Sequence, residues 1–214
     1  SGIDRVMYVD LDAHHGDGVQ DAYNDDKRVL TVSIHEENRW PFSGPVSDRG
    51  GGQARNLPVP SGFNDSELNW LMTHAVLPLA ERFQPGAVVI TCGADALHGD
   101  PLSHMALSNV ALWDAVDALV AACPRTVVLG GGGYNPWTVV RCWTGLWGRL
   151  AGYEIPGQLP PAAQELLASY ECDLVDEEDI DPAWLTSLQD VPRKGPVRER
   201  VRQLAERVMT QTGT

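Results

Sequence analysis

The most informative stretch of the sequence is residues 8–18, which read Tyr8-Val9-Asp10-Leu11-Asp12-Ala13-His14-His15-Gly16-Asp17-Gly18. They begin inside an apolar run that is typical of a buried strand. Asp12 and His14 stand two positions apart, so in an extended backbone their side chains point to the same side. Carboxylate and imidazole groups at the end of a strand are ligands that a zinc-class ion prefers. The spacing therefore predicts a metal site.

Two other interpretations of this stretch compete with the metal site. An EF-hand loop that starts at Asp10 would need glycine at its sixth position, where His15 stands, so that interpretation fails. A solvated polar loop that leads into a helix near Gly18 would need only one or two such side chains. We therefore favour metal binding.

Composition limits the class of protein. A length of 214 residues predicts one domain with a substantial core, and a net charge of −13 argues against binding to nucleic acid. An acidic run at residues 171–181 is interpreted as a solvated surface loop. No membrane span or signal peptide is expected. The scattered cysteines predict reduced thiols in a cytoplasmic protein: Cys92, Cys123, Cys142 and Cys172.

Short runs rich in Val and Ile predict strands, and longer amphipathic segments predict helices. The predicted strands are residues 5–11, residues 29–34, Ala87–Thr91 and Thr126–Leu129. The predicted helices are residues 66–83, with a kink at Pro78, residues 108–122, Pro136–Leu150 and residues 197–209. The alternation predicts an α/β fold, a three-layer sandwich in which helices flank a mostly parallel sheet. Residues 44–62 are predicted to be a long functional loop.

Two further polar clusters follow predicted strands, and ligands bind beyond the carboxyl ends of parallel strands. Asp95 follows Ala87–Thr91 and is the natural third zinc ligand, although a carboxylate there could also cap the next turn. Four glycines follow Thr126–Leu129 without matching a phosphate-loop pattern. They allow close backbone approach and place Tyr134, which could donate to developing negative charge or pack as a core tyrosine.

Taken together, these motifs resemble the zinc-dependent histone deacetylase family with its arginase/deacetylase-like fold. The resemblance is strongest to the bacterial acetoin-utilization branch, AcuC-like, favoured by Asp100-Pro101-Leu102-Ser103-His104-Met105 and residues 153–159. The matching motifs, in order, are YVDLDAHHGDG at residues 8–18, TVSIH at 31–35, GADALHGDP at 93–101 and GGGGYNPWTVVRCW at 130–143.

The resemblance implies an enzyme that hydrolyses acetyl-lysine in proteins, or small acetylated amines, with zinc-activated water. Zinc would bind Asp12, His14 and Asp95, and Tyr134 would polarise the amide carbonyl. A potassium ion would lie among Asp10, Asp12, His14, Ser33 and Ile34. The acyl-lysine tunnel would involve Phe42, Leu102 and Gly132, with His98 and His104 near its rim, although the family's Phe-Pro-Gly reads Phe-Ser-Gly here.

One family feature has no counterpart in these 214 residues. The family's general base is a pair of adjacent histidines upstream of the first motif, and Asp10 and Asp17 would each orient one of them. We therefore expect a single deacetylase-like domain, 1–214, that is incomplete at its N-terminus, with a core at 1–152 and a proline-rich acidic tail at 153–214. Residues 5–11 are expected to lose a neighbouring strand and leave an unpaired edge.

Three rival functions remain open. An arginase-like ureohydrolase, with two metals, needs a second pair of carboxylates, and after Ala87–Thr91 only Asp95 stands in place. An acetylpolyamine amidohydrolase would use the same zinc site. A non-catalytic fragment could bind acyl-lysine, form a homo-oligomer or pair with a chain that supplies the missing part.

Overall fold

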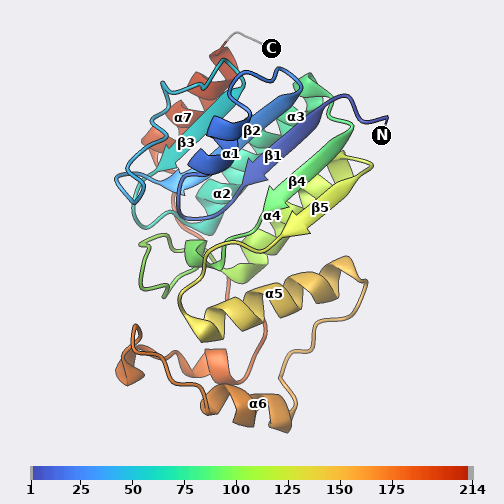
Figure 1. The fold of residues 1–214 in the computed structure, drawn as a ribbon. Helices are drawn as coiled ribbons and strands as arrows, with labels where there is room; N and C mark the ends of the chain where they lie inside the picture. Colours follow the sequence, from blue (N-terminus) through green and yellow to red (C-terminus); the bar gives the residue numbers. More distant parts are fainter. Residues whose placement is uncertain (1, 212–214) are drawn as a thin grey trace.

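The fold is described by a computed structural model covering residues 2–211, in which a parallel five-stranded sheet has the order β3-β2-β1-β4-β5 (Figure 1). All of its pairings are parallel. The strands are β1 (Val6–Asp10), β2 (Val29–Glu36), β3 (Ala54–Val59), β4 (Ala87–Thr91) and β5 (Thr126–Leu129). The predicted parallel sheet flanked by helices is confirmed, and so are the four predicted strands.

Two predictions about the sheet are wrong. The strand at residues 5–11 is not an unpaired edge, because β1 pairs with β2 on one side and with β4 on the other. The free edges belong to β3 and β5. Residues 44–62 are not loop throughout, since Ala54–Val59 forms β3. Pro58 made a strand difficult to predict here. Proline is tolerated in β3 because an edge strand does not need every backbone N–H group for pairing.

The segment predicted as one helix over residues 66–83 is divided into three. It consists of α2 (Asp65–Leu71), a π-helical turn η1 (Met72–Val76) and α3 (Leu77–Phe83). The disturbance lies before Pro78 because a proline ring collides with the carbonyl four residues earlier, and a π turn relieves that collision. Asn64 and Glu67 form a capping box at the start of α2.

The remaining helices complete the fold. They are α1 (Asp17–Ala22), η2 (Ala94–Ala96), α4 (Asn109–Ala122), α5 (Pro136–Leu150), α6 (Pro161–Ala168), η3 (Glu177–Asp179), η4 (Pro182–Leu185) and α7 (Glu199–Thr210). The helices predicted at residues 108–122, Pro136–Leu150 and 197–209 correspond to α4, α5 and α7. Within residues 2–211, no helix combines the length and the apolar character needed to cross a membrane.

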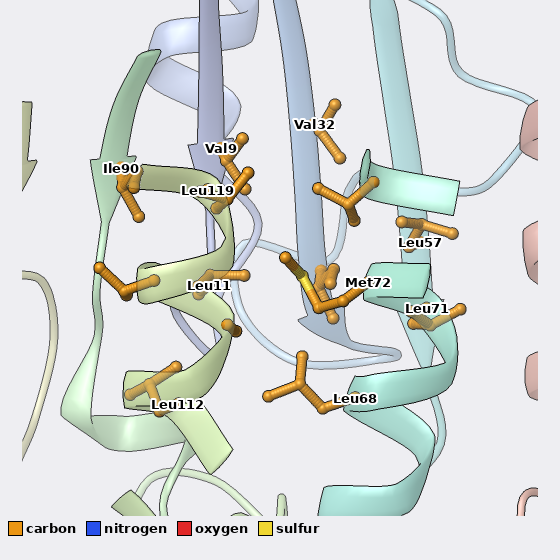
Figure 2. Close-up of a cluster of buried hydrophobic side chains, with 14 of the residues drawn as sticks. Val9, Leu11, Val32, Leu57, Leu68, Leu71, Met72, Ile90, Leu112 and Leu119 are labelled. Carbon is orange, nitrogen blue, oxygen red and sulfur yellow. The ribbon is translucent and has the colours of Figure 1, made fainter. Parts of the chain in front are cut away.

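The two faces of the sheet are covered unequally. On one face, alternate strand residues pack against α2, η1 and α4, as Val9, Val32 and Ile90 do in Figure 2. We call this the back face. The opposite, front face carries α1 near β1 and β2 (Figure 1), and β1, β2 and β3 are buried almost throughout. Residues of β4 and β5 alternate between more and less buried, so the front of these two strands is only partly covered.

A second, smaller apolar cluster lies below the sheet in Figure 1, where α5 and α6 meet the chain around η4. It contains Trp137, Leu159, Leu167 and Trp184. The Trp137 indole donates to the Leu167 carbonyl at 2.8 Å, which ties α5 to α6. The acidic segment after Glu171 is therefore anchored by packed apolar residues rather than being only a solvated loop.

Candidate metal centre

The three predicted zinc ligands come together at the carboxyl end of the sheet. Asp12 and His14 follow β1, and Asp95 lies in η2, shortly after the neighbouring strand β4. One potential ligand atom from each side chain lies within 4.8 Å of the other two. Among residues 2–211 this is the one such group of three found. Parallel pairing of β1 and β4 brings together residues that are about 80 positions apart in the sequence.

Backbone groups hold both carboxylates in place. The Gly132 N–H donates to Asp12 Oδ2 at 2.6 Å, and the Ala13 N–H donates to Asp95 Oδ1 at 2.9 Å. The other oxygens, Asp12 Oδ1 and Asp95 Oδ2, lie 3.1 and 2.9 Å from His14 Nδ1. Two carboxylate oxygens and one imidazole nitrogen thus converge, and this donor set fits a catalytic zinc that keeps a coordination position open.

The electrostatics of the three groups also fit a bound cation. Hydrogen bonds to Asp12 and Asp95 raise the pKa of His14 to about 10, outweighing the opposite effect of burial. Burial raises the pKa of Asp95, and the charge of nearby Asp12 adds to this increase. Two carboxylates this close repel each other unless a positive charge lies between them. A proton on His14 supplies that charge here, and a divalent ion would supply more.

The glycine-rich loop after β5 closes the site from one side. A Cβ atom at Gly132 would lie 2.1 Å from Asp95 Oδ2, and one at Gly131 would lie 2.8 Å from Asp12 Oδ2. Close approach of the backbone to the carboxylates therefore requires glycine at both positions. This agrees with the predicted role of the four glycines.

Tyr134 lies at the edge of the metal centre. Its ring centroid is 6.1 Å from that of His14, with the two planes nearly perpendicular, and 39% of the residue is exposed. Burial and the charges of Asp95 and Asp12 raise the pKa of the phenol, so it keeps its proton and can donate a hydrogen bond. This partly exposed position is unlike that of a core tyrosine.

Asp100 holds Tyr134 in place and was not among the predicted site residues. The Tyr134 N–H donates to Asp100 Oδ2 at 2.7 Å, and the Leu102 N–H donates to Asp100 Oδ1 at 2.9 Å. One buried carboxylate therefore joins the glycine-rich loop to the loop that carries Leu102. The sequence carried a signal, since Asp100 lies inside the motif at residues 93–101.

The other predicted residues are not part of this group of three potential ligands. Asp10 accepts from the Tyr8 hydroxyl at 2.6 Å and from the Asp12 N–H at 3.0 Å. Ser33 is the register partner of Asp10 on β2, and buried Ile34 follows it. Asp17 begins α1 and accepts from the N–H of the next residue.

The residue after His14 belongs to a buried network of imidazoles that the sequence did not reveal. The rings of His15 and His35 lie 4.8 Å apart. The His35 Nε2–H donates to the Gly44 carbonyl at 3.0 Å, and His35 Nδ1 accepts from the Ser33 hydroxyl at 2.9 Å. Burial, with a smaller effect from His15, lowers the pKa of His35 to about 3, so this ring is neutral.

Each ring nitrogen of His15 has its own hydrogen-bond partner. Gln20 donates its amide to Asp48 at 2.9 Å, which turns its carbonyl oxygen toward His15 Nε2 at 3.1 Å. Nε2 therefore carries a proton, and Nδ1 lies 2.8 Å from the Ser43 hydroxyl oxygen. Ser43 stands where the family pattern has proline, and its hydroxyl connects the loop of Phe42 to the metal-bearing loop.

Several aromatic and apolar side chains on the loops after the strands are exposed. Phe42 and Leu102 are among them, and the ring centroid of Trp40, which was not predicted, lies 6.3 Å from that of His14. Glu36 accepts from the Arg39 guanidinium and from the His104 N–H at 2.8 Å. This buried carboxylate therefore links the two loops that carry Phe42 and Leu102. His98 lies beside a separate hollow of about 310 Å³ with Asp181 and Trp184.

Comparison with known proteins gives a consistent picture. A family profile described as "Histone deacetylase domain" matches residues 1–150. Histone deacetylase 8 of Danio rerio is 37% identical over 163 residues, covering 73% of this chain and 43% of that protein. Histone deacetylase 8 of Xenopus laevis is 32% identical over 212 residues, covering 96% of this chain and 64% of that protein. The chain therefore spans less than two thirds of either relative.

Solved structures match over nearly the whole chain. The crystal structure of a histone deacetylase homologue from Aquifex aeolicus has a TM-score of 0.89 and 36% identity, covering 97% of this chain and 57% of the other. A structure of such a homologue complexed with SAHA has a TM-score of 0.88 and 35% identity, with the same coverage. These structures bear out the deacetylase-like α/β fold.

Proposed function

Because the chain belongs to the histone deacetylase family, we propose that the protein is a zinc-dependent hydrolase that removes acetyl groups from acetyl-lysine. The observation that carries this proposal is the convergence of Asp12, His14 and Asp95 within 4.8 Å at the end of the sheet. Zinc bound there would polarise the amide carbonyl and lower the pKa of a water molecule.

The surrounding residues have defined parts in this proposal. The Gly132 and Ala13 N–H groups fix the two carboxylates in one orientation. The Tyr134 hydroxyl donates to the oxygen that becomes negative as the amide is attacked. Phe42 and Leu102 form the walls of the acyl-lysine tunnel, and Gly132 leaves room at its base. A potassium ion among Asp10, Asp12, His14, Ser33 and Ile34 completes the proposal.

The general base comes from outside these 214 residues in our proposal, because their own histidines are otherwise engaged. His14 lies between the carboxylates, and His15 and His35 belong to the buried network. His74 stacks on the Trp70 ring at 3.7 Å. The ring of His104 contacts the Arg39 guanidinium, and His98 lies beside the separate hollow. Asp10 and Asp17 would orient the supplied histidines.

On the motif at residues 100–105 we further propose that the protein belongs to the bacterial acetoin-utilization, AcuC-like branch and acts on acetylated proteins or small acetylated amines in the cytoplasm. We also propose that residues 1–214 belong to one domain. An arginase-like two-metal enzyme is disfavoured, since one group of three potential ligands was found among residues 2–211. An acetylpolyamine amidohydrolase would use the same zinc site and would differ from a protein deacetylase in its substrate.

Metal stoichiometry tests the site and the rival together. Native mass spectrometry of the zinc-loaded chain is expected to show one zinc ion per chain. The control variant Asp26→Ala removes a carboxylate that pairs with Arg28 on the surface, and it should still bind one zinc ion. Two metals per chain would favour the ureohydrolase. The zinc-loaded complete protein should then release acetate from an acetyl-lysine peptide; release from acetylated polyamines alone would favour the amidohydrolase.

A further inference from the structure

Glu36 lies where three loops around the metal centre meet. It is the last residue of β2 and is 4% exposed, so its carboxylate is buried at the end of that strand. Its backbone N–H donates to the Ala13 carbonyl at 2.9 Å, and Ala13 stands between the candidate ligands Asp12 and His14. The main chain of Glu36 is therefore fixed to the loop that carries two of the three candidate ligands.

The Glu36 side chain extends this connection to the segment that follows β2 and carries Phe42. Its two carboxylate oxygens accept from Nε and Nη2 of Arg39 at 2.9 and 3.0 Å. This paired geometry fixes the plane of the guanidinium as well as its position. The Arg39 carbonyl in turn accepts from the Phe42 N–H at 2.7 Å. Glu36 is thus connected to the backbone of Phe42 through a single residue.

The backbone of Phe42 needs such support. Its φ angle of 62° lies in the left-handed region, which a residue with a large side chain seldom adopts. A backbone conformation of this kind persists only where the surrounding contacts hold it. The turn closed by the Arg39 carbonyl, together with the Glu36 carboxylate that binds Arg39, supplies contacts of this kind.

The same carboxylate also holds the segment that carries Leu102. Glu36 Oε2 accepts from the His104 N–H at 2.8 Å, and the His104 carbonyl accepts from the Gly62 N–H at 2.7 Å. The Leu102 N–H donates to Asp100 at 2.9 Å. The backbone of this segment is therefore fixed both at Leu102 and two residues beyond it.

The positions of Phe42 and Leu102 depend on these backbone contacts, since both side chains are exposed. We propose that Glu36 is a positioning residue that holds Phe42 and Leu102 at the separation needed to contact the methylene chain of an acyl-lysine. The tunnel walls belong to the proposed deacetylase function, on which this inference rests. Glu36 is buried and acts through Arg39 and the His104 N–H, so it affects how tightly the substrate binds rather than how fast the amide bond breaks.

A purely structural role of Glu36 is the alternative. Removing one partner of a buried ion pair destabilises a fold, and a less stable enzyme contains fewer active molecules. Such a loss lowers kcat and leaves the KM of the remaining molecules unchanged. Loss of a contact that binds substrate and transition state equally raises KM and leaves kcat unchanged. The two roles therefore predict opposite kinetic changes.

The test compares the complete zinc-loaded protein with its variant Glu36→Gln, which keeps the size of the side chain and removes its charge. An amide has one acceptor oxygen, so its NH₂ group would face a donor, either on Arg39 or on the backbone of His104. The KM for an acetyl-lysine peptide should rise about tenfold, the effect of losing contact with about two methylenes. The kcat should change by less than about twofold.

Two further variants locate the effect. Glu37→Gln is the matched control, because Glu37 is the next residue and also pairs with an arginine, but that partner is Arg200 of α7. Its KM should equal that of the wild type. Arg39→Lys keeps the positive charge and loses the paired geometry, so it should raise KM less than Glu36→Gln does. It also decides the question if Glu36→Gln does not fold.

Hydrogen exchange reports on the two segments without catalysis. In Glu36→Gln the backbone amides of Phe42 and His104 should exchange at least about tenfold faster than in the wild type, because the contacts that fix them are weakened. In Glu37→Gln both amides should exchange at the wild-type rate.

Three results would overturn the proposal. They are an unchanged KM in Glu36→Gln, an unchanged exchange rate at either amide in that variant, and an equal rise of KM in Glu37→Gln. All three leave the proposed deacetylase function standing. A wild-type protein that hydrolyses no acyl-lysine would instead overturn the proposed function, and the positioning role with it.

Discussion

The two halves of the sheet differ in how completely they are buried, and the metal centre draws on both. β1, β2 and β3 are buried almost throughout, and the network of His15 and His35 holds the loops at their ends. β4 and β5 are partly covered, and the segments that follow them carry Asp95 and Tyr134. The covered half thus presents ligands on a rigid support, while the open half contributes equally important groups beside an uncovered surface.

The largest expected effect comes from removing the ligand that the open half supplies. Asp95→Ala leaves two of three ligands, so zinc affinity should fall by more than the roughly 10–100-fold that loss of an outer partner costs. Competition with a chromophoric chelator measures this, and Asp12→Ala should show a comparable loss from the covered half. Unchanged affinity in Asp95→Ala would contradict the ligand assignment.

The next effect concerns the activity and association of the 214-residue chain by itself. Without a general base near the metal, the zinc-loaded 214-residue chain should hydrolyse an acetyl-lysine peptide about 10²–10⁴ times more slowly than the same chain joined to a segment with a His-His pair. Its exposed β5 edge should also favour association, which light scattering would detect. Full activity from a monomer of this chain would mean that one of its own histidines serves as base.

The Tyr134 hydroxyl is the other functional group that the open half of the sheet supplies. In the complete enzyme, Tyr134→Phe should lower kcat by roughly 100-fold or more, because one donor to the developing oxyanion is lost. Zinc affinity should stay unchanged, since the phenol is not among the three ligands. Steady-state kinetics of both proteins provide the measurement; near-normal turnover would contradict the proposed role of the Tyr134 hydroxyl.

The covered half should be sensitive to acid through His35. Its pKa is lowered to about 3 in the folded chain, whereas an unfolded histidine titrates near about 6.5, so only the unfolded state takes up this proton as pH falls between these values. Protonation of His35 in the unfolded state should lower the free energy of unfolding by about 2 kcal/mol between pH 7.5 and pH 5. Urea unfolding of the wild type and His35→Gln should show a smaller pH dependence in the variant. Equal pH dependence would contradict the neutral buried ring.

The smallest effect concerns the hydroxyl that joins the Phe42 loop to His15. Ser43→Ala removes the hydroxyl partner of His15 Nδ1 and should cost about 1 kcal/mol of unfolding free energy. Nitrogen NMR of His15 should show that Nε2 keeps its proton, because the Gln20 carbonyl still accepts from it, while the Nδ1 signal shifts. An unchanged Nδ1 signal would contradict the contact with Ser43.

Local patterns were sufficient for much of this fold and site. The two-residue spacing of Asp12 and His14 predicted that both side chains point to one side, and the position of Asp95 after a strand predicted a third ligand. Spacing could not reveal Asp100, Trp40 or the imidazole network, because these residues act through partners far away in the sequence. Pro58 hid β3, since local propensity does not show whether a strand lies at an edge.

The sequence alone was sufficient for β1, β2, β4 and β5, for α4, α5 and α7, and for the types of candidate ligand, because these depend on side-chain periodicity and chemistry within a few residues. The order of the strands, with β1 at the centre and β5 at an open edge, became known from the folded structure. Strand order depends on the parallel pairing of distant segments and on which faces bury apolar area. Those interactions exist only once the chain has folded, so the open half of the sheet could not be found before the structure was known.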